Sequence, residues 1–196
     1  MPTLVTRQEY FDSAIEILST EGFRGVQVVK LCKAMGVTTG SFYNYFRNLK
    51  DFTAQFLKSW RQNLTKQLIE AAEQVDEPGE RLRKLTALAM TVPHEAEAAI
   101  RAWSKVDPMV LATQQEVDEL RLGLIRRAVL LVSPDDPQAD QLANLGLSIV
   151  VGMQQLQSPI NLDDLRWSLD QYVDMVLARA AQRAGGKRSK PTRAWN

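Results

Sequence analysis

The segment Gly36–Phe46, with the sequence GVTTGSFYNYF, concentrates side chains that can hydrogen-bond to nucleic acid. Hydroxyl and amide groups suit phosphate oxygens and base edges. If Thr38 caps a helix that begins at the next residue, Phe42 and Phe46 lie four residues apart on one side and pack against the preceding helices. The outward side then carries Thr39, Gly40, Tyr43 and Asn44. The pattern therefore predicts a short helix with a packing side and an outward polar side.

Candidate catalytic residues are few, and each has a structural explanation. The pairs Asp135–Asp136 and Asp163–Asp164 stand at predicted helix starts, where the helix dipole favours acids. The one histidine, His94, lacks partners at metal-site or dyad spacing, so we expect it on the solvated surface. Cys32 is expected in a core, where a thiol is usually inert. No phosphate-binding glycine loop or nucleophile elbow occurs, so we predict no catalytic residue, metal or cofactor.

Helix signals dominate the rest of the chain. Thr6 and Glu9 form a predicted capping box, and apolar residues then recur at helical spacing as far as Gly22, a typical helix stop. Alternating strand patterns with hairpin turns are not found. The sequence predicts an all-α fold of about nine helices, over residues 6–21, 27–35, 38–45, 48–73, 79–91, 93–104, 107–131, 134–156 and 161–183.

The second and third predicted helices are short and are joined by Gly36, Val37 and Thr38. Two short helices with such a turn are typical of a helix-turn-helix, in which the second helix enters the DNA major groove. Gly36 can adopt a left-handed turn conformation, and Gly40 removes bulk where DNA would approach. The alternative is that the motif serves only packing, as it does in many helical proteins.

Composition is that of an ordinary globular protein. Hydrophobic residues make up 45% of the 196 residues, and 24 Lys and Arg balance 23 Asp and Glu, so global charge gives no argument for nucleic acid. One cysteine excludes an intrachain disulfide, and neither a signal peptide nor an apolar run of the roughly 18 residues of a membrane span is found. We therefore expect a cytoplasmic protein without a membrane partner.

Three stretches resemble the DNA-binding domain of tetracycline-repressor (TetR) type transcriptional regulators: Gly22-Phe23, LCKAMGVTTGSFYNYF over residues 31–46, and the following RNLKDF. The resemblance is specific over about residues 6 to 55. Beyond them it rests on length, the helical pattern and a looser likeness of AIRAWSKVDPMV to the family's ligand domain.

The resemblance implies a DNA-binding domain over residues 1–52 and a helical effector-binding and dimerisation domain over 53–184. Residues 185–196 are basic and lack apolar periodicity, so we expect a disordered tail there. It also implies contacts with double-stranded DNA from Thr38, Thr39, Gly40, Ser41, Tyr43 and Tyr45. We expect the two tyrosine hydroxyls to hold phosphates, and Thr39 and Asn44 to approach bases. Gln27 and Lys50 are added because they stand at, or next to, positions where many members contact phosphate.

The predicted effector domain carries flat or adaptable side chains that could line a cavity for a small-molecule effector, although each could equally be ordinary core. They are Trp60, Met90, Trp103, Met109 and Met153. Apolar faces on the last two helices are assigned to a homodimer, as the resemblance implies, although a monomer could bury them itself. They carry Leu142, Leu145, Gly146, Ile149, Val150, Leu165, Leu169, Tyr172, Val173 and Val176.

These expectations together describe a ligand-responsive transcriptional regulator that binds a palindromic operator as a dimer and is released by an effector, most simply a repressor. Two alternatives stay open. One is a TetR-fold protein that acts through partners without operator specificity. The other, less favoured, is a helical enzyme.

Overall fold

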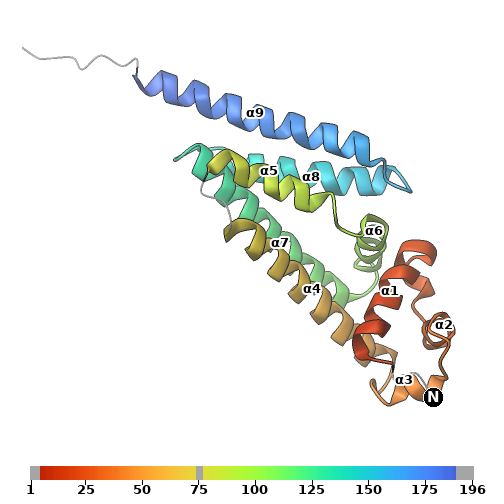
Figure 1. The fold of residues 1–196 in the computed structure, drawn as a ribbon. Helices are drawn as coiled ribbons and strands as arrows, with labels where there is room; N and C mark the ends of the chain where they lie inside the picture. Colours follow the sequence, from red (N-terminus) through yellow and green to blue (C-terminus); the bar gives the residue numbers. More distant parts are fainter. Residues whose placement is uncertain (1–4, 74–76, 189–196) are drawn as a thin grey trace, which may run out of the picture.

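The computed structural model describes residues 5–73 and 77–188 and forms nine α-helices, one 3-10 helix and no strand over them (Figure 1). The bounds are α1 Arg7–Glu21, η1 Phe23–Gly25, α2 Val28–Ala34, α3 Thr39–Tyr43, α4 Leu49–Glu73, α5 Pro78–Ala89, α6 His94–Trp103, α7 Pro108–Val132, α8 Ala139–Leu156 and α9 Leu162–Arg188. The all-α prediction is confirmed. No described helix combines the length and hydrophobicity that a membrane span requires.

Figure 1 shows α1, α2 and α3 gathered at one end of the molecule, with α4 and α7 leading away from them and α8 and α9 at the far end. α4 packs along α5 and α7, and α8 packs on α7 and α9. α4 is one continuous helix across the expected domain boundary after residue 52. The N-terminal helices are therefore joined rigidly to the rest.

Local capping signals set most helix ends where the sequence predicts them. The Thr6 hydroxyl accepts from the backbone N–H of Glu9, and the Glu9 carboxylate accepts from the Thr6 N–H at 2.6 Å, which makes the predicted capping box. Gly22 ends α1 with φ 70°, and Gly36 follows α2 with φ 66°. Both adopt the left-handed conformation that side chains disfavour.

The predicted start of the eighth helix at residue 134 is wrong, because α8 begins at Ala139. Asp136 does not cap a helix there. Its buried carboxylate accepts hydrogen bonds from Nε and Nη2 of Arg179, at 2.8 and 2.9 Å. It also accepts one from the backbone N–H of Gln138. The hydrogen bond and charge of Arg179 hold the pKa of Asp136 well below its usual range. Asp135 takes a positive φ of 59°, so the chain turns before the helix can start.

The N-terminal helices close around an aromatic cluster. Phe42 and Phe46 are buried, as predicted, with ring centroids 5.0 Å apart, and Phe46 meets Phe52 edge-on at 4.9 Å. Tyr10 of α1 makes edge contacts with both Phe42 and Phe46. Each such pair contributes about 0.5–1.5 kcal/mol beyond the burial of its area. This cluster orients α3 against α1 and α4.

The same hydrophobic core continues out of the N-terminal helices into α6 and α7. Ala96 and Ile100 of α6 are fully buried in it, together with Val110 and Val117 of α7. α6 packs closely along α1. The core therefore has no break at the expected domain boundary.

The last two helices bury most of the residues assigned to the dimer. Eight of the ten are already covered within one chain, Ile149 is partly buried, and Leu145 alone is exposed. Tyr172 shows why: its ring packs on Gly146, and its hydroxyl donates to the Leu142 carbonyl at 3.0 Å. Burial raises the pKa of Tyr172 to about 12. Gly146, which we had assigned to the dimer, thus permits a close approach of two helices inside the subunit.

α9 continues to Arg188, past residue 185 where we had expected order to end. Near the end of α9, the guanidinium of Arg183 pairs with Asp136 and donates to the Asp135 carbonyl at 3.0 Å. The rest of the predicted disordered tail lies outside the described residues.

Gly146→Ala should lower the free energy of unfolding by about 1–3 kcal/mol. The added methyl would lie 2.9 Å from Cζ of Tyr172, and this buried ring cannot move away without disturbing its own packing. Gly152→Ala is the matched control on the same helix, where the added methyl meets nothing within 4 Å. It should stabilise the protein by about 0.5–1 kcal/mol through helix propensity. Denaturant unfolding measures both, and equal stability of the two variants would contradict this packing.

Candidate DNA-binding surface and effector cavity

α2, the turn and α3 form a helix-turn-helix with the predicted turn. Val37 N–H donates to the Cys32 carbonyl at 2.9 Å across the left-handed Gly36, so the chain reverses tightly after α2. The Thr38 hydroxyl then accepts from the backbone N–H of Ser41 at 3.3 Å and caps α3. α3 itself is shorter than predicted and ends at Tyr43.

The predicted outward side of α3 is confirmed. Thr39, Gly40, Tyr43 and Asn44 are all exposed, and Tyr43 keeps 57% of its surface open even though its ring is large. Among the described residues, no side-chain hydrogen bond involves Thr39, Tyr43 or Asn44. Their polar groups are free to meet a partner.

Ser41 and Tyr45 are engaged within the protein. The Ser41 hydroxyl accepts from the hydroxyl of the buried Tyr10 at 3.1 Å. The Tyr45 hydroxyl donates to the backbone carbonyl of Val5, just before α1. Both residues are only partly exposed, so a phosphate would have to compete with these bonds.

Gln27 and Lys50 are exposed at the starts of α2 and α4. Gln27 occupies the N-cap position without capping through its side chain, which donates to the Arg24 carbonyl at 2.9 Å. Leu49, the neighbour of Lys50, packs against the core. Arg47, absent from our predicted contacts, has a side chain that is 87% exposed beside α3 and pairs weakly with Asp51 at 3.4 Å. Its position in a polar loop was the only sequence signal.

Neither the backbone conformation nor the packing of the chain requires a glycine at position 40. It lies in ordinary helical conformation, and a methyl group added there would meet only the Thr38 hydroxyl, at 3.6 Å. Glycine in a helix costs about 1 kcal/mol relative to alanine. Packing within the chain therefore does not require this residue.

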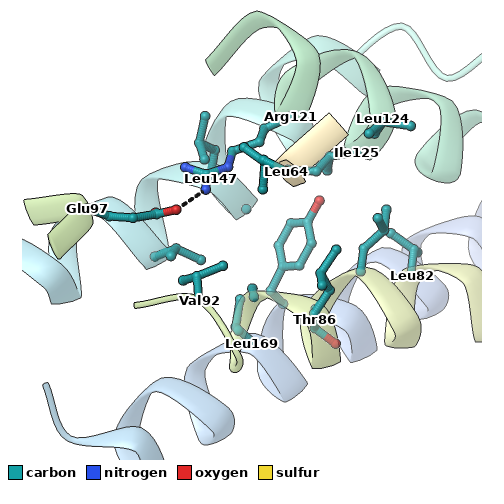
Figure 2. A pocket seen from close by; sticks show the side chains of 16 residues that line it. Leu64, Leu82, Thr86, Val92, Glu97, Arg121, Leu124, Ile125, Leu147 and Leu169 are labelled. Atoms are coloured by element: carbon teal, nitrogen blue, oxygen red, sulfur yellow. Dashed lines mark hydrogen bonds and ion pairs between the residues drawn. The ribbon is translucent and has the colours of Figure 1, made fainter. Parts of the chain in front are cut away.

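A separate, largely apolar cavity lies between α4, α5, α7, α8 and α9, and Figure 2 shows it from close by. It offers about 80 Å³ of space for the centre of a water molecule. Its walls are mainly aliphatic side chains, among them Leu64, Leu82, Leu85, Leu124, Ile125, Leu147, Val150 and Leu169. A wider groove between α4 and α7 is open and lined by charged residues such as Arg61 and Glu116, which suits a drug-sized apolar ligand less well.

One end of the cavity is charged. Figure 2 shows Glu97 of α6 and Arg121 of α7 meeting there, opposite Leu82 and Leu124. The Arg121 Nη2 to Glu97 Oε1 distance is 2.5 Å, and the two side chains are 11% and 5% exposed. Sequence analysis missed both residues. A carboxylate beside the buried Ala96–Ile100 stripe of a short helix was the available sign of a buried ion pair.

The prediction for His94 is wrong, because this side chain is 5% exposed. The start of α6 is covered by α1 and α8, and Nδ1 of His94 lies 3.1 Å from Nε2 of Gln154. The same amide donates to Glu97 Oε2 at 3.2 Å. Burial lowers the pKa of His94, so the imidazole is neutral near pH 7. No described group of three acidic, histidine or cysteine side chains gathers as a metal site would need.

None of the five side chains proposed as effector contacts lines this cavity. Trp60 is buried in the core of the N-terminal helices, and Met109 packs against the same core. Met90 and Met153 pack against the small core that Val150, Leu165 and Leu169 form between α8 and α9. Trp103 stacks on the ring of Phe23 at 6.1 Å and 15°, which joins α6 to η1. Their role in ligand binding stays a prediction.

Comparison with known proteins agrees with this architecture. Residues 11–52 match the model of the bacterial regulatory proteins of the tetR family. No curated protein has a matching sequence. A transcriptional regulator from Rhodococcus sp. Rha1 shares the fold with a TM-score of 0.75 at 18% identity, over 89% of this chain and 97% of that one.

Two other similar structures hold ligands. One, from Saccharomonospora viridis in complex with choline, has a TM-score of 0.74 at 15% identity, over 86% of this chain and 95% of that one. The transcriptional regulator FadR from Bacillus subtilis, in complex with stearoyl-CoA, has a TM-score of 0.65 at 13% identity, over 88% and 98%. Over the helix-turn-helix the chain is therefore similar to the bacterial regulatory proteins of the tetR family, and as a whole it shares the fold of these solved transcriptional regulators.

Proposed function

We propose that the protein is a dimeric, ligand-responsive regulator that binds a palindromic operator through α3 and is released from it by a small-molecule effector. The observation that carries the DNA-binding part is the outward side of α3, where exposed polar groups surround a glycine that the chain's own packing does not need. A glycine of that kind suits the close approach of another molecule.

The packing-only alternative explains one side of α3 but not the other. Phe42 and Phe46 supply its packing and are buried. Thr39 and Asn44 are exposed, and their groups match phosphate oxygens and base edges in type. We therefore assign direct base contacts to Thr39 and Asn44 and phosphate contacts to Tyr43, Lys50 and Arg47.

The partner-dependent alternative draws on different residues. Leu49 packs inward, and Ser41 and Tyr45 are engaged inside the protein, so this chain offers fewer phosphate contacts than the family pattern implies. Affinity for DNA without regard to sequence depends mainly on such contacts. Fewer phosphate contacts would weaken DNA binding by this chain alone, which is the observation that keeps the partner-dependent alternative open.

The dimer we propose uses the exposed side of α8 and α9, because their buried sides are taken up within the subunit. Leu145 and Leu156 of α8 and Trp167 and Met175 of α9 are large apolar residues left exposed there. Two subunits joined through one two-fold axis would present two α3 helices, which matches a palindrome with half-sites one or more helical turns apart.

We place the effector in the apolar cavity between α4, α5, α7, α8 and α9. Proteins of the same fold hold choline and stearoyl-CoA, which supports a ligand site in this class of structure. α6 contacts both the cavity, through Glu97, and α1, through the shared core. An effector that prefers the non-binding arrangement by ~3 kcal/mol would weaken DNA binding about a hundredfold.

Fragments of the source genome, incubated with the purified protein at near-physiological salt and then recovered and sequenced, test operator binding directly. We expect enrichment of a single palindrome, because the two α3 helices of the dimer must fit two half-sites at the same time. Uniform weak recovery that added salt abolishes would contradict operator specificity and favour the partner-dependent alternative.

Gly40→Ala separates DNA contact from packing. We expect at least tenfold weaker binding to the recovered palindrome, since a methyl group would stand between α3 and DNA, with unfolding stability unchanged or raised by up to about 1 kcal/mol. Gly152→Ala, on α8, should leave DNA affinity unchanged. Fluorescence anisotropy gives the affinities, and an unaltered affinity in Gly40→Ala would show that α3 does not lie against the DNA.

Trp167→Glu should convert the dimer into monomers of 22.1 kDa, because a charge replaces an apolar side chain in the proposed interface. Val106→Glu is the matched control, since Val106 is 68% exposed and Trp167 is 66% exposed. Light scattering after size exclusion gives the mass in solution. A Trp167→Glu protein that keeps the wild-type mass of a dimer would place the interface elsewhere.

A further inference from the structure

The charged end of the cavity is electrically balanced. Arg121 contributes one positive charge and Glu97 one negative charge, and they are paired directly. Both side chains are about nine-tenths buried or more. His94, one step behind Glu97 through Gln154, is neutral near pH 7. Any charge that a ligand brought into this end would therefore find no free counter-charge.

The hydrogen-bonding capacity of this end is unbalanced in favour of donors. The Glu97 oxygens accept from Arg121 and Gln154. Arg121 uses Nη2 for this bond, and its Nε and Nη1 groups make no hydrogen bond within the described residues. A guanidinium has five N–H donors and no acceptor. The end of the cavity can therefore donate to a ligand acceptor.

The other polar groups of the wall are already used as donors. The Thr86 hydroxyl donates to the Arg83 carbonyl at 2.8 Å, and the Tyr172 hydroxyl donates to the Leu142 carbonyl. The remaining wall is aliphatic. The centre of a water molecule can move through about 80 Å³ of this cavity, so the space exceeds what a single water occupies. This size fits a molecule built on a single small ring or a short chain.

We propose that the cavity selects an uncharged apolar molecule of this size that carries one hydrogen-bond acceptor, such as a ketone or ester carbonyl, placed against Arg121. An anion would be attracted by Arg121 but repelled by Glu97. The free-energy cost of removing its hydration shell would therefore not be offset. A cation would be attracted by Glu97 but repelled by Arg121, so its desolvation cost would not be offset either. This inference rests on the proposed effector site, but it concerns ligand chemistry alone and is tested without DNA.

Three probes of nearly the same shape, each with nine non-hydrogen atoms, separate the contributions. Acetophenone has the neutral carbonyl, benzoate replaces it with a carboxylate, and isopropylbenzene has no acceptor. NMR titration of the wild-type protein near pH 7 should give acetophenone at least tenfold tighter binding than benzoate, and tighter binding than isopropylbenzene.

Glu97→Gln should reverse the charge preference, because the Arg121 charge is then uncompensated while the volume of the side chain is kept. We expect benzoate to bind this variant at least tenfold more tightly than it binds wild type, and to overtake acetophenone. Glu95→Gln makes the same chemical change two residues away on α6, outside the cavity wall, and should keep the wild-type order.

Failure of acetophenone to bind wild type, or equal affinity of wild type for acetophenone and benzoate, would overturn the inference. The wild-type comparison decides the matter even if Glu97→Gln does not fold. Binding in the expected order without any release of the operator would uphold the ligand chemistry and refute the effector role instead. The two proposals can therefore fail separately.

Discussion

α6 has to satisfy two kinds of neighbour within ten residues. One side carries Ala96 and Ile100, which are fully buried in the core shared with α1. The other side carries His94, Glu97 and Arg101 at helical spacing, and all three reach α7 or α8 through polar contacts. Buried charges are tolerated only when they are paired. The position of α6 is therefore fixed from both sides, and the arrangement of α1, α7 and α8 depends on it.

This constraint links the two candidate sites. The Arg101 guanidinium holds Asp118 of α7 with two bonds of 2.8 Å, one helical turn beyond Glu97 and its partner Arg121. α6 is thus bound to α7 as a rigid unit, while its apolar side supports the helix that carries Tyr10 and the aromatic cluster behind α3. A displacement at the cavity end would have a continuous, tightly packed route to the outward side of α3.

Sequence patterns predicted what depends on near neighbours. The capping box of Thr6, the left-handed glycines and the division of α3 into two sides all follow from spacings of a few residues. The start of α8 was missed because Arg179, 43 residues later, turns Asp136 inward. The cavity was missed for the same reason, since six helices contribute to it and ordinary leucines form much of its wall. The tryptophans and methionines that we predicted as effector contacts have side chains of a type that can line a cavity. In the structure they pack against core residues instead.

The stack of Trp103 on Phe23 has an optical consequence. It lies at the seam between α6 and η1, and Arg24 stands 6.0 Å over the other ring of the pair. Indole emission responds to the polarity and contacts of its surroundings. A movement of α6 relative to the N-terminal helices would therefore alter the intrinsic fluorescence of this protein, so the chain carries its own spectroscopic label at the joint between its two halves.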